Sequence, residues 1–134
     1  MGIIILRHRH TILVIDDSAV TIALFQAMLG EEYELLYASR GEQGIEMAMR
    51  MRPDLILLDV MMPGMDGYEV CRRLKRNRET MVIPVIFITF LEHEEDEEMG
   101  IEAGAIDFMT KPFHEAIMKA KLRNHFALLD LLRA

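Results

Sequence analysis

The sequence predicts an α/β fold, in which a parallel β-sheet is covered by helices on both faces. Short apolar runs alternate with helix-like patterns five times along the chain, and the connections between them are short. Four of the five runs are almost continuously apolar, as expected for strands buried on both faces of a parallel sheet. The 134 residues are enough for one domain with a sizeable core.

The first two strands are each followed by a helix whose ends carry recognisable signals. A strand at residues 11–16 leads into a helix at 19–29, and a strand at 33–38 leads into a helix at 40–51. The first helix is expected to have a serine N-cap and a glycine just past its end, and the second to begin with a capping box and to stop before a proline. These signals are Ser18 and Gly30 for the first helix, and Ser39, Glu42 and Pro53 for the second.

The remaining three strands continue the alternation. Strands are predicted at residues 55–59, 85–89 and 105–109, and two further helices at 68–76 and 94–103. A last helix runs from shortly after the fifth strand to near the end of the chain. The supporting signals are the turn-rich loop at 63–67, Pro84, Gly104, and a helix start at Phe113 or His114.

Composition excludes several classes of protein. Hydrophobic residues make up 51% and charged residues 28% of the chain, which is not typical of a disordered chain. No apolar run approaches the ~20 residues of a membrane span, and the net charge of −7 argues against direct nucleic-acid binding. The single cysteine, Cys71, fits a reducing compartment, so we expect a cytoplasmic protein. Residues 1–10 are interpreted as an N-terminal extension without a signal peptide.

Polar residues stand at the carboxyl ends of the predicted strands, the edge of such sheets where ligands bind. Three carboxylates within ~5 Å would repel by about 3 kcal/mol per pair at an effective dielectric constant near 20. A bound cation would relieve this repulsion, and oxygen ligands without His or Cys favour Mg²⁺, with Mn²⁺ as the alternative. The residues placed at this edge are Asp16, Asp17, Asp59, Thr89 and Lys111.

Each of these residues has a candidate role. Asp59 is the candidate nucleophile, because a carboxylate can become an aspartyl-phosphate, and Asp16 and Asp17 are candidate cation ligands. Lys111 and Thr89 are candidates to bind phosphoryl oxygens. No nucleotide-binding glycine motif is present, so a bound nucleotide is not expected to supply the phosphate. Taken singly, each residue also has an ordinary explanation as a helix cap, a strand residue or a solvated lysine.

Three motifs surround these residues. They are ILVIDDS at 12–18, LLDVMMPGMDG at 57–67 and AGAIDFMTKPF at 103–113. Together they strongly resemble the receiver domain of bacterial two-component response regulators, the family of the chemotaxis protein CheY. The resemblance extends from residue 11 to about residue 123 and implies a (βα)5 flavodoxin-like, doubly wound parallel sheet with strand order 2-1-3-4-5. The domain itself is placed at residues 11–127.

The resemblance also implies a site and a partner. A sensor histidine kinase or a phosphotransfer protein would donate a phosphoryl group to Asp59. Mg²⁺ would be bound by Asp17, Asp59 and the Met61 backbone carbonyl, with Asp16 acting through water. Thr89 and Lys111 would bind the phosphoryl group, and the Lys111–Pro112 peptide bond would be cis.

A conformational switch follows from the same resemblance. When phosphate draws Thr89 inward, Phe108 gains room to turn inward, which changes the face formed by the helix at 94–103, the last strand and the last helix. This face is a candidate homodimer interface. Residues 128–134 are interpreted as the end of the last helix and as a candidate start of a linker to an output domain.

One residue departs from the family pattern. The position after the switch hydroxyl is usually small, but here it is Phe90. A ring near the phosphoryl pocket would restrict attacking water and small phosphodonors, so that phosphate is lost slowly. The sequence fits equally well with a ring that points away from the pocket and only reshapes the neighbouring helix.

Two other functions are compatible with an aspartate and its neighbours at this edge of the sheet. A magnesium-dependent phosphohydrolase with an aspartyl nucleophile often has a second aspartate two residues after the first, but that position is Met61, which disfavours the enzyme. A binding module with an inert pocket would not require the combination of Asp17, Asp59, Thr89 and Lys111. The acidic run at residues 92–98 is interpreted as a solvated loop and helix start rather than a second metal site.

Overall fold

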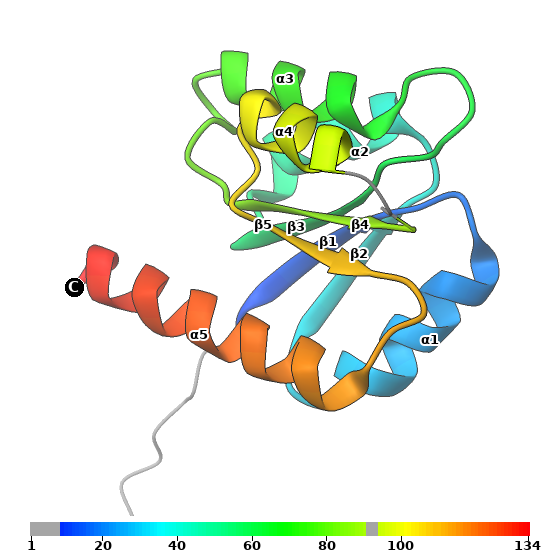
Figure 1. Ribbon diagram of the computed structural model, residues 1–134. Helices are drawn as coiled ribbons and strands as arrows, with labels where there is room; N and C mark the ends of the chain where they lie inside the picture. Colours follow the sequence, from blue (N-terminus) through cyan, green and yellow to red (C-terminus); the bar gives the residue numbers. More distant parts are fainter. Residues whose placement is uncertain (1–8, 91–93) are drawn as a thin grey trace, which may run out of the picture.

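The structure is a computed structural model that describes residues 9–90 and 94–134, apart from the side chains of residues 94–97. A five-stranded parallel sheet lies between two layers of helices (Figure 1), with strand order β2-β1-β3-β4-β5. The predicted fold class and strand order are therefore confirmed. The strands are β1 (Thr11–Ile15), β2 (Glu34–Ala38), β3 (Leu55–Asp59), β4 (Val85–Thr89) and β5 (Asp107–Thr110).

The five helices divide between the two faces of the sheet. Three helices cover one face of the sheet and pack against one buried cluster of strand residues (Figure 1). The other two helices cover the opposite face and pack against a second buried cluster. Every residue of β3 and β4 is buried, which explains why these segments read as continuous apolar runs. The first layer contains α2 (Gly41–Met51), α3 (Gly67–Arg76) and α4 (Glu94–Ala103), and the second contains α1 (Ala19–Leu29) and α5 (Glu115–Arg133).

The ends of the elements show where local signals succeed and fail. Ser18 caps α1 as predicted, because its hydroxyl accepts a hydrogen bond from the Thr21 amide. The capping box predicted for α2 is wrong: Arg40 is the N-cap and makes no side-chain cap hydrogen bond. The Ser39 amide instead donates to the Gln43 side chain at 3.0 Å, which takes this serine out of the helix start.

The last strand is displaced from its predicted position. It covers Asp107–Thr110 rather than 105–109, because Gly104 has a φ of +105° and the two residues that follow it complete a turn. The Ala105 amide donates to the Gly100 carbonyl, and the Ile106 amide donates to the Val85 carbonyl. The strand therefore begins only after the chain has crossed from α4 to the sheet.

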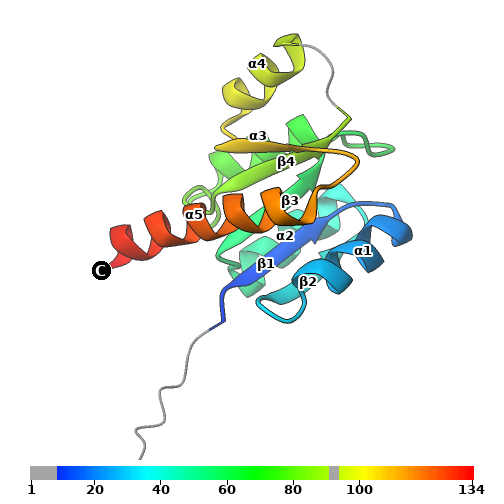
Figure 2. The same ribbon diagram turned by 60° about the horizontal axis from the view of Figure 1, so that its bottom comes forward.

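The last turns of α5 are attached to the amino ends of the strands, and the helix extends beyond the sheet on that side (Figure 1, Figure 2). The His10 ring stacks on Phe126 at 4.2 Å, and its Nε2 lies 2.8 Å from an Asp130 oxygen. Arg133 pairs with Asp54 at 2.7 Å. Arg9 donates to the carbonyls of Gly30 and Tyr33. Thus the last part of the predicted N-terminal extension contacts the domain, while residues 1–8 lie outside the described part of the chain.

No helix within the described ranges combines the length and the apolar character that crossing a membrane requires. The Glu92 and His93 part of the acidic run lies outside the described residues.

Candidate phosphoacceptor site

The carboxyl ends of β1, β3, β4 and β5 bring together the residues predicted to form the site. All strands run in the same direction, and the arrowheads of β4 and β5 in Figure 1 point to the edge where they lie. Asp59 and Thr89 are the last residues of β3 and β4, and Asp16 follows β1 directly. Lys111 follows β5, and its amide donates to the Thr89 carbonyl at 2.8 Å. The sheet topology therefore brings these side chains together although they lie far apart in the sequence.

Three carboxylates form the centre of the site. Oxygen atoms from Asp16, Asp17 and Asp59 all lie within 4.8 Å of one another. Asp16 is fully buried and Asp59 is 5% exposed, whereas Asp17 faces solvent. The Ser18 amide donates to Asp16 Oδ1 at 2.8 Å, a contact that the sequence analysis did not anticipate. Two buried carboxylates and one exposed carboxylate leave one open side to this cluster.

The second oxygen of Asp16 is incompletely satisfied. Asp16 Oδ2 is buried and accepts no hydrogen bond from any described residue. The Lys111 ammonium lies 3.5 Å from this oxygen and 3.8 Å from Asp59 Oδ1, so one cation is shared between two buried acids. A buried carboxylate oxygen without a donor is energetically unfavourable unless a cation or water binds it. The donor set of hard oxygens fits Mg²⁺.

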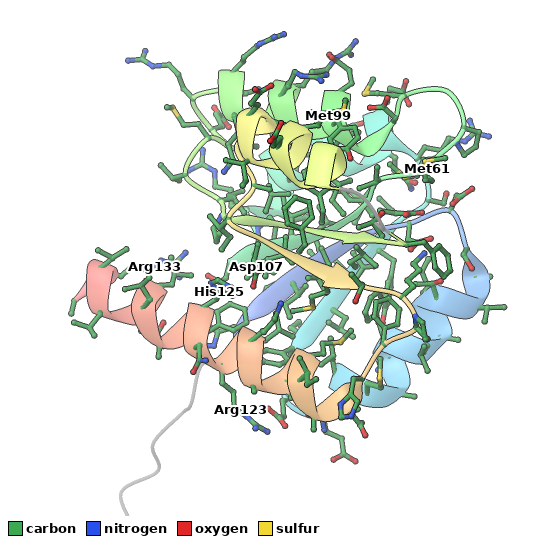
Figure 3. The ribbon with its side chains drawn as sticks, viewed as in Figure 1. Met61, Met99, Asp107, Arg123, His125 and Arg133 are labelled. Carbon is green, nitrogen blue, oxygen red and sulfur yellow. The ribbon has the colours of Figure 1, made fainter. Side chains whose placement is uncertain are left out.

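The surroundings of Asp59 raise the pKa of its carboxyl group above the ordinary value. Burial and, next in importance, the negative charge of Asp16 raise the pKa of this carboxyl group to about 6. The Lys111 charge and the Met61 amide, which donates to Asp59 Oδ1 at 3.3 Å, act in the opposite direction. The Met61 side chain is exposed, so this residue faces the site through its backbone (Figure 3). The ionised Asp59 carboxylate is therefore poorly stabilised by the protein alone, and a bound cation would stabilise it.

Gly67 is a positioning residue that the sequence analysis missed. Its amide donates to the Val60 carbonyl at 2.9 Å, which closes the loop after β3. A Cβ atom at this position would lie 2.3 Å from the Asp59 carbonyl oxygen and 2.8 Å from the Val60 Cα atom. Because backbone atoms cannot move aside as a flexible side chain can, the approach of α3 to the end of β3 requires glycine.

Phe90 lies beside the site rather than away from it. The Lys111 ammonium is 5.4 Å from the centroid of the Phe90 ring, within the range of a cation–π interaction. Thr89, the residue before it, is only 3% exposed, whereas Phe90 is 67% exposed. The Lys111–Pro112 bond that follows β5 is cis, as the family resemblance implied. The Phe90 ring and the carboxylates of Asp16 and Asp59 thus lie around the same ammonium group.

Phe108 occupies an inward position against α4. Its ring is half-buried and stacks on Phe87 with centroids 5.8 Å apart. A Cβ atom at Gly100 would lie 2.3 Å from Phe108 Cζ, so the ring rests directly on the α4 backbone. Phe108 also lines a hollow of about 370 Å³, together with Ile101, Ile106, Asp107, Thr110 and Lys121.

Comparison with known proteins identifies the family. The family model described as "Response regulator receiver domain" matches residues 12–123. The chain belongs to this receiver domain family. Among curated relatives, the receiver domain is 47% identical over 114 residues to "Response regulator PleD" of Caulobacter vibrioides. The match covers 84% of this chain and 25% of PleD, so the chain spans about a quarter of that relative's length.

Solved structures agree with this assignment. The receiver domain matches that of sensor histidine kinase PA1611 from Pseudomonas aeruginosa, with a TM-score of 0.80, 30% identity, and coverage of 87% of this chain and 97% of the other. That structure is described as having a magnesium ion coordinated in its active site cleft. Chemotaxis protein CheY4 of Vibrio cholerae matches with a TM-score of 0.83 and 25% identity, over 87% of this chain and 98% of that one. This chain is therefore a receiver domain of two-component signalling.

Proposed function

We propose that Asp59 is the phosphoacceptor of this receiver domain and takes its phosphoryl group from a phosphohistidine of a sensor histidine kinase or a phosphotransfer protein. The observation that carries the proposal is the position of Asp59, a nearly buried carboxylate at the end of β3 that faces a lysine ammonium and two further carboxylates. An isolated acid in this place would destabilise the fold without a compensating partner.

In the proposed transfer, an Asp59 carboxylate oxygen forms a bond to phosphorus while the phosphorus–nitrogen bond of the donor histidine breaks. The imidazole leaves with the electron pair of that bond and takes up a proton. The Lys111 ammonium pairs with a phosphoryl oxygen in place of Asp59, and the Thr89 hydroxyl donates to another oxygen. Water attack on phosphorus reverses the modification. The domain accelerates both steps on itself and turns over no free substrate.

Asp16, Asp17, Asp59 and the backbone carbonyl of Met61 are the proposed ligands of Mg²⁺, with Asp16 acting through water and Mn²⁺ as an acceptable substitute. The bound ion supplies positive charge between the carboxylates and the incoming phosphoryl oxygens. Support comes from the three clustered oxygens and from the buried Asp16 Oδ2, which lacks a donor within the described part of the chain.

Beryllofluoride, a stable mimic of the phosphoryl group, tests the proposal. In the presence of Mg²⁺ it should bind the wild-type protein and shift the amide resonances of residues around Asp59, because beryllium bonds to the carboxylate. Asp59→Asn should abolish binding, whereas Asp130→Asn, which changes an exposed carboxylate at the other end of the sheet, should retain it. Binding that survives in Asp59→Asn, or turnover of a small phosphate ester by the wild-type protein, would contradict the proposal.

The proposed output surface is the face formed by α4, β5 and α5, which Met99, Asp107 and His125 mark in Figure 3. Thr89 and Phe108 are proposed to couple the site to this face. Phosphorylation can shift the face from its inactive to its active conformation only if the phosphoryl group is bound more favourably in the active one. Large apolar side chains are exposed there, which supports a homodimer interface. They are Met99, Ile101, Ile106 and Ile117.

The wider context of the domain is also proposed. Leu128, Leu131 and Leu132 are exposed on the last turns of α5, which supports residues 128–134 as the start of a linker to an output domain. We propose that the domain works in the cytoplasm and acts on its targets through protein partners, without direct contact to nucleic acid. The net charge of −7 supports the latter point.

A further inference from the structure

We propose that Phe90 shields the phosphoryl group on Asp59, and that the Lys111 ammonium holds the ring over the site through a cation–π interaction. The inference rests on the proposed function and concerns how long the modification lasts. It makes Phe90 a shielding residue, distinct from the groups that bind the phosphoryl oxygens.

The position of the ring needs an explanation, because the Phe90 side chain is 67% exposed and belongs to neither buried cluster of the described core. An exposed ring directly after the last residue of β4 could rotate away from the site at no loss of core packing. It lies instead with its centroid 5.4 Å from Lys111 Nζ. The electron-rich face of an aromatic ring attracts a cation in this geometry, by about 0.5–1 kcal/mol at exposed sites.

The ammonium group is itself well placed to hold the ring. The Lys111 side chain is only 12% exposed, and its Nζ atom is fixed by Asp16 at 3.5 Å and Asp59 at 3.8 Å. A ring that follows this nitrogen therefore covers the approach to Asp59 from the β4–α4 side. A phosphoryl group on Asp59 keeps a negative charge beside Lys111, so the ammonium remains a cation and the ring remains attracted.

The consequence is a longer-lived aspartyl phosphate and slower labelling by small donors. Attacking water and a small phosphodonor need the same open approach to phosphorus, and the ring obstructs both. A donor histidine presented by a protein partner can displace the ring, because its own binding energy offsets the lost cation–π contact.

A series of four side chains at position 90 separates cation–π attraction from simple bulk. Phe90→Tyr keeps the aromatic face, Phe90→Leu keeps an apolar side chain without it, and Phe90→Ala removes both. All are expected to fold, because the side chain is mostly exposed. Each protein is labelled with phosphoramidate and Mg²⁺, and the loss of phosphate after donor removal is followed on phosphate-affinity gels.

We expect the leucine and alanine variants to lose phosphate about fivefold faster than wild type, the factor that corresponds to about 1 kcal/mol, and the tyrosine variant to behave like wild type. A leucine variant that matches wild type would show that bulk alone shields the site, and an unchanged alanine variant would show that nothing does. Either result overturns the inference.

A second readout is independent of phosphorylation. The ring current of Phe90 should shift the Lys111 methylene protons upfield in the unmodified wild-type and Phe90→Tyr proteins, and this shift should be absent in Phe90→Leu. An equal shift in all four proteins would overturn the contact. If the contact is present but no variant accepts a phosphoryl group, the proposed function fails and the geometry of the ring stands.

Discussion

Asp59→Asn is expected to stabilise the metal-free domain while it abolishes phosphorylation. Burial and the nearby Asp16 charge raise the pKa of Asp59 from 3.8 to about 6 in the folded protein. The folded state therefore binds a proton more tightly than the unfolded chain, and stability falls as the pH rises from about 4 to about 6. Above that window the ionised carboxylate destabilises the fold by up to about 3 kcal/mol, a penalty that a neutral asparagine does not incur.

Urea unfolding at several pH values in the presence of a chelator measures this effect. Wild type should lose stability between about pH 4 and pH 6 through this group, and Asp59→Asn should lack that loss. Glu46→Gln, which neutralises an exposed acid on α2, is the matched control and should retain the wild-type dependence. Mg²⁺ should reduce the difference in unfolding free energy between wild type and Asp59→Asn, because it stabilises wild type by binding the folded state. An asparagine variant less stable than wild type at neutral pH would contradict this account of the site.

Gly100→Ala is expected to move the switch residue. The added Cβ atom would lie 2.3 Å from Phe108 Cζ and 3.1 Å from Phe87 Cδ2, so the Phe108 ring cannot keep its inward position. We expect the ring to move into the hollow of about 370 Å³ that Phe108 already lines together with residues of α4, β5 and α5. Overpacking of this kind is unfavourable by about 1–3 kcal/mol, and alanine's greater helix propensity offsets up to about 1 kcal/mol of the effect on stability.

The functional consequence should exceed the change in stability. If the inward ring accompanies the phosphorylated state, a variant that disfavours it should bind beryllofluoride roughly tenfold more weakly, as expected for about 1.4 kcal/mol. Fluorine NMR of fluorophenylalanine at position 108 would report the ring position directly. Phe108→Ala in the Gly100→Ala background should restore most of the affinity, since it removes the clash, and Glu102→Ala on the same helix is the control. An unmoved ring with unchanged affinity would contradict the coupling, as would a wild-type ring that keeps one rotamer with and without beryllofluoride.

Much of the fold was predictable because strands that are buried on both faces consist of continuous apolar residues. β3 and β4 are buried along their whole length, and their predicted bounds match the structure. The displaced start of β5 was not predictable, since Ala105 and Ile106 are apolar like a strand yet complete the turn after Gly104. The α2 capping box failed for a similar reason, because a competing side chain, Gln43, captured the Ser39 amide.

Part of the candidate site was also predictable from the sequence, and part was not. The convergence of Asp16, Asp59 and Lys111 follows from the rule that parallel strands end at one edge, and the structure brings them together. The roles of Gly67 and Gly100 depend on contacts between segments far apart in sequence, which no local pattern encodes. For Gly100 one signal was available in the sequence, because it lies inside the predicted helix at 94–103. A glycine inside a helix is unfavourable by about 1 kcal/mol and usually has a packing reason.

Chemical trapping of the acyl phosphate identifies the residue that accepts the phosphoryl group. The protein is incubated with phosphoramidate and Mg²⁺ and then treated with borohydride, which reduces an aspartyl phosphate to homoserine, and the peptides are sequenced by mass spectrometry. We expect homoserine at position 59 and at no other aspartate position, with none formed when phosphoramidate is omitted. Homoserine at Asp16 or Asp17, or a phosphorylated protein in which residue 59 stays aspartate, would contradict this expectation.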